Sequence, residues 1–273
     1  MTEAMLEIML RRDRAIIVAA LIVLTALAWV HMLWLADGMA MDGMDMTGFR
    51  MIPAGISLMM PVSAPWQPVE FVFVFAMWAV MMVGMMTPSV VPMILIYARV
   101  GRQASAQGKP FTATGWFATG YLLTWVGFAL VAAAAQWALQ RTALLNPMMA
   151  SASQVFGGIV LIAAGVYQWT PLKDICLAQC QSPLLFIQRQ GGFHRDPLGS
   201  LSLGARHGVY CVGCCWVLMA LLFVGGVMNV LWIAAIAIFV LAEKIVPAGR
   251  LISRIAGAGF VAGGMWLLAT SLR

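Results

Sequence analysis

The stretch FVFVFAMWAVMMVGMMTPSVVPMILIY, from Phe71 to Tyr97, decides the fold class of this protein. It contains no charged residue and exceeds the about 20 apolar residues that an α-helix needs to cross a bilayer. We expect a span from near Val69 through Met86, with a continuation past the two prolines to Tyr97 left open. The stretch therefore predicts an integral membrane protein.

The composition of the whole chain supports this prediction. Hydrophobic residues make up 63% of the 273 positions and charged residues 10%, whereas a soluble domain has about 45–50% and about 25%. The net charge of +6 comes from basic residues spread thinly through short loops, which argues against nucleic acid as a partner. We predict one all-α membrane domain over residues 1–273, a polytopic transmembrane helical bundle in contact with the lipid bilayer.

Seven apolar runs are predicted to cross the membrane. They are Ala15–Ala36, Val69–Met86, Phe111–Leu139, Ser153–Trp169, Leu201–Val224, Met228–Leu241 and Leu251–Leu272. With the N-terminus in the cytoplasm, thirteen Lys and Arg residues lie inside and only Arg50, Arg141 and Arg273 lie outside. This asymmetry follows the positive-inside rule and supports an odd number of spans. Residues 37–67 then form an outer loop and residues 170–200 an inner loop.

All cysteines fall in two groups. One pair lies in the inner loop and three lie inside the fifth predicted span, at Cys176 and Cys180 and at Cys211, Cys214 and Cys215. On a helix, His207, Cys211 and Cys214 share an arc of about 60°, which Cys215 widens to about 100°. Cys211 lies roughly 15 Å into the span, near the bilayer middle.

Three interpretations of the cysteines remain open. They are small buried hydrophobes, a transient redox pair in a reducing compartment, or a soft metal site for Cu(I), zinc or an iron–sulfur cluster. Their spacing matches no zinc-finger signature, so spacing alone does not name the metal. We favour the metal site, because three cysteines in five residues lie within reach of a second pair on the same membrane side.

Methionine, present 22 times, is the second signal. Four methionines of the outer loop alternate with aspartates, at Met39, Met41, Met44 and Met46. In the second span, Met77, Met81 and Met85 recur every four residues. Methionine can be a flexible core filler, but thioethers also bind Cu(I) without deprotonation in an oxidising compartment. The order from outer thioethers to inner thiols predicts ligand strength that rises inward, provided that spans two and five are neighbours.

Two further features concern helix ends and helix packing. Glu243 and Lys244 end the sixth span, where they form a functional pair or neutralise each other at the interface. Gly259 and Gly263 form a GxxxG motif in the seventh span, which indicates close helix packing.

Several stretches together resemble a known family. They are FAMWAVMMVGMMTPSVVPM (Phe75–Met93), YQWTPLKDICLAQCQSP (Tyr167–Pro183), GVYCVGCCWVLM (Gly208–Met219), GGVMNVLW (Gly225–Trp232) and AEKIVP (Ala242–Pro247). They are similar to the bacterial family of predicted metal-binding integral membrane proteins, domain of unknown function 2182. The resemblance implies a multi-pass protein of the bacterial inner membrane with a metal role, and it implies no established reaction.

The preferred functional expectation is a membrane protein that binds Cu(I) and moves or delivers it through Met and Cys ligands. The predicted ligands are Cys176, Cys180, His207, Cys211, Cys214, Cys215, Met77, Met81, Met85, Met39, Met41, Met44 and Met46. Zinc and iron are the alternative metals, and a metallochaperone or metalloenzyme is the expected partner. The alternative functions are a membrane thiol oxidoreductase that uses Cys pairs and a structural or assembly subunit. The sequence predicts no catalytic residue.

Overall fold

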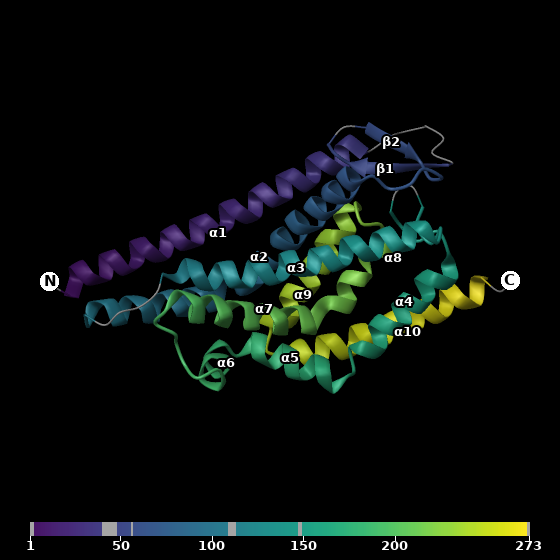
Figure 1. Ribbon diagram of the computed structural model, residues 1–273. Coiled ribbons are helices and arrows are strands. Elements are labelled where there is room, and N and C mark those ends of the chain that lie inside the picture. The colour runs from purple at the N-terminus through teal and green to yellow at the C-terminus, as the bar shows by residue number, and fades with distance from the viewer. Residues whose placement is uncertain (1–2, 40–47, 56, 109–112, 147–148, 272–273) are drawn as a thin grey trace.

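The structure, a computed structural model, describes residues 3–39, 48–55, 57–108, 113–146 and 149–271. Helices dominate the described chain and pack on one another at varied angles, with a small hairpin at one end (Figure 1). The expectation of an all-α bundle is confirmed at this level. Helices are the natural result, because backbone groups in lipid must hydrogen-bond within their own segment.

Within the described ranges, five helical stretches are long and apolar enough to cross a membrane. They lie in α1 (Glu3–Met39), α2 (Pro68–Ala106), α3 (Thr114–Arg141), α7 (Pro197–Ala220), which continues through the short α8 (Leu222–Gly225), and α10 (Gly249–Ser271). These helices are compatible with a multi-pass membrane protein. The stretch around Pro88 and Pro92 stays helical, so α2 continues past both prolines and beyond Tyr97.

The remaining predicted spans are shorter. The fourth is α4 (Gln154–Tyr167), which bends by 65° into α5 (Pro171–Gln181), so that the two make a sixth crossing only if taken as one broken span. Thr170 caps α5 and Pro171 begins it. The sixth predicted span is α9 (Val230–Ile245), with 16 residues. The count of seven spans therefore stays a prediction.

The two regions predicted as loops contain regular structure. Residues 170–200 include α5 and the short α6 (Pro183–Arg189). Residues 37–67 include an antiparallel hairpin of β1 (Phe49–Pro53) and β2 (Ser57–Pro61), in which Met51 pairs with Met59. A buried Arg50–Glu70 salt bridge of 2.9 Å ties this hairpin to the start of α2. Residues 40–47, which hold Met41, Met44 and Met46, lie outside the described residues.

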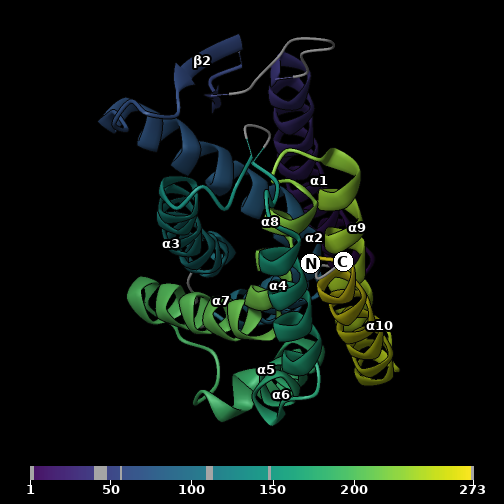
Figure 2. The same cartoon turned by 90° about the vertical axis from the view of Figure 1, so that its right-hand side faces the viewer.

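Glycines set the closest helix contacts. A Cβ on Gly120 of α3 would lie 2.0 Å from the carbonyl oxygen of Leu201, and one on Gly204 of α7 would lie 2.0 Å from that of Phe117. These two glycines let α3 and α7 touch backbone to backbone. Figure 2 shows α3 and α7 as neighbours on one side of the bundle, with α4 beside α10 on the other.

The packing prediction for the last span is wrong in detail. Added Cβ atoms at Gly259 and Gly263 would meet nothing within 4 Å, so this GxxxG motif mediates no contact among the described residues. Instead, Gly257 and Gly264 of α10 approach the backbone of Gly165 and Gly158 in α4, with gaps of 2.9 Å and 2.6 Å from the added Cβ to the carbonyl oxygens.

Candidate functional site

The buried face of α7 carries the predicted thiol ligands. Cys211, Cys214 and Cys215 are at most 2% exposed, and His207 one turn earlier is 3% exposed. The thiols of Cys214 and Cys215 both donate to the carbonyl oxygen of Cys211 at 3.0 Å. The burial agrees with the common inward face that helical spacing predicts.

Helix α5 brings the second cysteine pair to the same place. Cys176 Sγ packs so closely on α7 that a Cβ at Gly213 would lie only 2.8 Å from it. The Cys180 thiol lies close to the thiols of Cys211 and Cys214. The five cysteines, all within the described ranges, are free thiols. We call these five residues the thiol cluster.

Two residues that were not among the predicted ligands complete the surroundings of Cys211. The Nζ atom of Lys244, in the last turn of α9, lies 2.8 Å from Cys211 Sγ and 3.3 Å from the hydroxyl of Ser89. The hydroxyl of Tyr121, from α3, lies 3.1 Å from the same sulfur. Side chains from α3, α5 and α9 therefore surround this thiol of α7, and Ser89 of α2 contacts both Lys244 and Tyr121 beside it. In the sequence, the presence of a lysine at the end of an apolar run was the signal that pointed to Lys244.

The expected pairing of Glu243 with Lys244 is wrong. Glu243 instead accepts two hydrogen bonds from Lys173 Nζ, at 2.8 Å and 2.9 Å, and one of 2.6 Å from Ser253. Adjacent residues on a helix point about 100° apart, so one faces α5 while the other faces the thiol cluster. Helix α9 thus contacts both cysteine-bearing helices through two neighbouring side chains.

His207 lies in an aromatic environment. Its ring packs edge-on against Phe186 at 4.9 Å between centroids, and the rings of Phe117 and Tyr121 lie slightly farther away, at 6.1 Å and 5.9 Å. Its Nδ1 atom is buried and has no hydrogen-bond partner among the described residues. An unpartnered ring nitrogen beside the cluster leaves a donor atom available to a ligand.

The predicted methionine ligands of α2 lie in the buried core of the bundle. Met77, Met81 and Met85 are at most 2% exposed, and Met39 at the end of α1 is 1% exposed. Between α2 and α7, the Tyr121 hydroxyl donates to the carbonyl oxygen of Met86 at 3.1 Å while contacting Cys211. Helix α3 packs on both α2 and α7. The inward ligand gradient requires spans two and five to be neighbours. Helices α2 and α7 are instead bridged by Tyr121 of α3 and Lys244 of α9.

A polar network also orients one thioether. The Nε2 group of Gln136, which is fully buried, donates to the sulfur of Met149 at 3.1 Å, and its Oε1 accepts from Trp78 at 2.7 Å. Met149 adopts a left-handed backbone conformation with φ of 58°. Neither Gln136 nor Met149 was among the predicted site residues.

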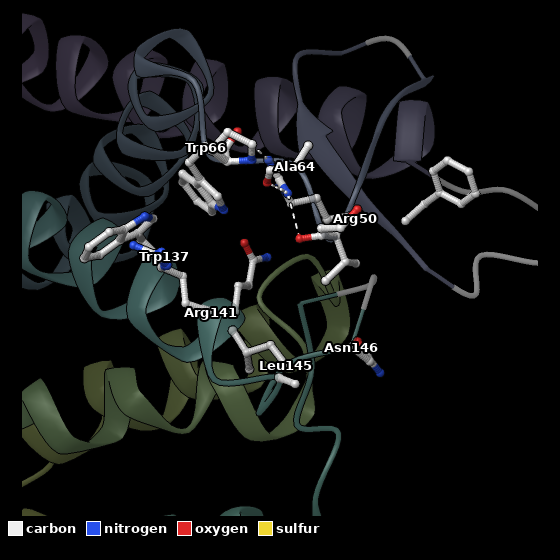
Figure 3. Close-up of a pocket in the computed structure, with 13 residues that line it drawn as sticks. Arg50, Ala64, Trp66, Trp137, Arg141, Leu145 and Asn146 are labelled. Atoms are coloured by element: carbon white, nitrogen blue, oxygen red, sulfur yellow. Dashed lines mark hydrogen bonds between the residues drawn. The ribbon is translucent and has the colours of Figure 1, made fainter.

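A separate cavity of about 460 Å³ lies at the hairpin end of the bundle. Figure 3 shows Trp66, Trp137 and Arg141 on one side of its opening and Arg50 on the other. Arg141 stacks on Trp137, and Arg50 holds the carbonyl oxygens of Pro61 and Ala64 at 2.8 Å. Cations and indole rings line this cavity rather than sulfur, so it is distinct from the thiol cluster.

The described thiols are packed in contact but are not arranged as a finished metal cage. Within the described ranges, no group of three or more His, Cys, Asp or Glu side chains is positioned to hold a metal ion. The donor chemistry nevertheless fits a soft ion, since buried thiols from two helices adjoin an ammonium group that compensates negative charge. Turning Cys214 and Cys215 away from the Cys211 carbonyl would free their sulfurs for a metal.

The fold and the site together define an apolar helical protein with a buried sulfur cluster. The sequence profile of the family described as PpoB2, copper chaperone, matches residues 75–267. The chain belongs to this copper chaperone family, whose name differs from that of the domain of unknown function 2182. No curated protein and no solved structure matches the chain. The expectation of a copper-related protein is confirmed, whereas the oxidation state and the ligands stay predictions.

Proposed function

We propose that the protein binds Cu(I) at the thiol cluster as cargo and delivers it to a partner protein. The observation that carries the proposal is the meeting of Cys180 of α5 with Cys211 and Cys214 of α7 in a buried site. Thiolates select soft ions such as Cu(I). Membership in the copper chaperone family supports copper over zinc and iron.

Burial of the site suits a monovalent cargo. Each thiolate carries a negative charge that is costly in an apolar interior unless it is paired. Lys244 and a bound Cu(I) together supply two positive charges, which balance two thiolates. The two-thiolate arrangement therefore leaves the centre neutral.

The route to the cluster is part of the same proposal. Met77, Met81 and Met85 supply weaker thioether ligands along α2, and Met41, Met44 and Met46 of the outer loop capture the ion. Met39, buried at the end of α1, receives it next. Ligand strength then rises toward the thiols, which favours inward movement. We propose the bacterial inner membrane as the location and a metallochaperone or metalloenzyme as the recipient.

Metal analysis of purified protein tests the proposal. We expect the wild-type protein to retain Cu(I) against a chromophoric Cu(I) chelator and to give sulfur-dominated X-ray absorption at copper. A variant with all five cysteines changed to Ser should lose this binding, while a variant with Met77, Met81 and Met85 changed to Leu should keep the tight site. If the wild-type protein holds no more Cu(I) than the cysteine-free variant, the result contradicts the proposal.

One contact favours a second candidate, a membrane thiol oxidoreductase. Cys180 lies against Cys211, and Lys244 stabilises a thiolate at Cys211, which a nucleophilic thiol needs. Oxidation of the Cys211 thiolate and the Cys180 thiol to a disulfide would release two electrons and one proton. A quinone-type acceptor would take up both electrons, that proton and a second proton from Lys244. Thiol trapping in intact cells separates the candidates, since the copper chaperone should show no oxidised Cys180–Cys211 fraction.

A further inference from the structure

The positive charge beside the thiol cluster has no acidic partner. Lys244 is 7% exposed, and no carboxylate pairs with it in the part of the chain that the structure describes. The carboxylate of the preceding residue, Glu243, forms a salt bridge with Lys173. The groups that face Lys244 are Cys211, Ser89 and Tyr121, which are neutral or become negative only by losing a proton.

The position of this charge is fixed by its surroundings. Its ammonium group lies between Cys211 Sγ and Ser89 Oγ, and the side chain is buried. The helix that carries it is anchored at the neighbouring residue, where Glu243 binds Lys173 and Ser253, and its backbone oxygen accepts from Gln181 at 2.7 Å. Lys244 therefore stays close to any ion that Cys211 binds.

We propose that Lys244 makes the thiol cluster selective for a monovalent over a divalent metal ion. The inference rests on the proposed function, because it assumes that Cys211 is a ligand. A metal bound at about 2.3 Å from Cys211 Sγ lies within about 5 Å of the ammonium group. The fixed positive charge repels a divalent ion twice as strongly as a monovalent one.

Coulomb's law gives the size of the effect. With an effective dielectric constant of about 20 and a separation of about 5 Å, one extra unit of charge changes the ratio of the two affinities by about two orders of magnitude. Relaxation of the site reduces this value, so we expect at least about a tenfold effect. The discrimination does not depend on the number of thiolates, provided that both ions use the same set.

The test compares Ag(I), a redox-stable stand-in for Cu(I), with Zn(II) on purified full-length protein. We expect Lys244→Met to raise the ratio of Zn(II) to Ag(I) affinity by at least about tenfold, measured by competition with chelators of known affinity. Lys244→Arg keeps the charge and should leave the ratio near the wild-type value. Ser89→Ala is the matched control, since it removes a hydrogen-bond partner of Lys244 without changing any charge.

The outcomes separate this inference from the proposed function. An unchanged ratio in Lys244→Met, with Ag(I) still bound by the wild type, overturns the role of Lys244 alone. A folded wild-type protein that binds no Ag(I) contradicts the proposed function itself. Lys244→Gln, which keeps a hydrogen-bond donor for Cys211, replaces the methionine variant if that variant does not fold, and it should show the same change in ratio.

Discussion

Lys244 Nζ lies 2.8 Å from Cys211 Sγ, and both side chains are buried between α7 and α9. This contact joins a cation to the thiol that side chains from α3, α5 and α9 surround. A buried cation is stable only with a compensating group, and Cys211 is the strongest one available to Lys244 among the described residues. The pair thus links the stability of the bundle to the chemistry of the thiol cluster.

Replacing one member of this pair should lower the free energy of unfolding more than replacing both. Cys211→Ala leaves Lys244 buried with only Ser89 and Tyr121 beside it, so we expect a loss of about 3 kcal/mol in the free energy of unfolding. The double variant Cys211→Ala with Lys244→Met should recover much of that loss, because an apolar pair needs no compensation. Unfolding followed by tryptophan fluorescence in detergent measures both values. A double variant that loses as much free energy of unfolding as Cys211→Ala alone would contradict this expectation.

The Lys173–Glu243 salt bridge should hold α5 in place. Lys173→Met leaves the buried Glu243 without its cation, and we expect a destabilisation of about 3–5 kcal/mol with α5 loosened from α7. Cys176, which packs on Gly213, should then react with a maleimide faster than in the wild type. The comparison uses protein in which the other four cysteines are Ser. Unchanged Cys176 reactivity would show that other contacts hold α5.

Close approach of α3 and α7 should be essential to the contact between Tyr121 and Cys211. Gly120→Val would place side-chain atoms on the backbone of Leu201, and we expect helix separation and weaker metal retention. Gly127→Val on the same helix is the matched control, since a Cβ there meets nothing within 4 Å. Thermal stability and retained copper measure both variants. Similar behaviour of the two would contradict the packing argument.

The Arg50–Glu70 salt bridge should stabilise the hairpin end of the bundle. Glu70→Gln removes the negative charge opposite a buried guanidinium group, and we expect faster amide hydrogen exchange in residues 49–53 and 57–65. Asp174→Asn is the control, because Asp174 and Arg254 are 3.8 Å apart, with Arg254 exposed and Asp174 partly exposed, and such a pair contributes little. Exchange that is as slow in Glu70→Gln as in the control would argue that hydrogen bonds alone hold the hairpin.

Some of the candidate site could be predicted because it is local in sequence. The shared face of His207, Cys211, Cys214 and Cys215 follows from helical spacing, and all four are buried as expected. The meeting of Cys180 with Cys211 was only a possibility in the sequence, since many packings bring an inner segment near a span. The glycine contacts show the same limit. The GxxxG motif at Gly259 and Gly263 is recognisable, but which helix face meets a neighbour depends on the whole bundle.

The sequence by itself determined the all-α fold class with its long apolar helices, the grouping of thiols on α7 and a copper-related role, because apolar run length, helical period and the kind of ligand residue are properties of the chain order. Only the tertiary structure decided the partners of the charged residues. Glu243 and Lys244 are adjacent in the chain, yet one binds Lys173 and the other contacts Cys211. The physical reason is that neighbouring helical residues face different directions, and each buried charge takes the compensating group that the packing brings to its own side.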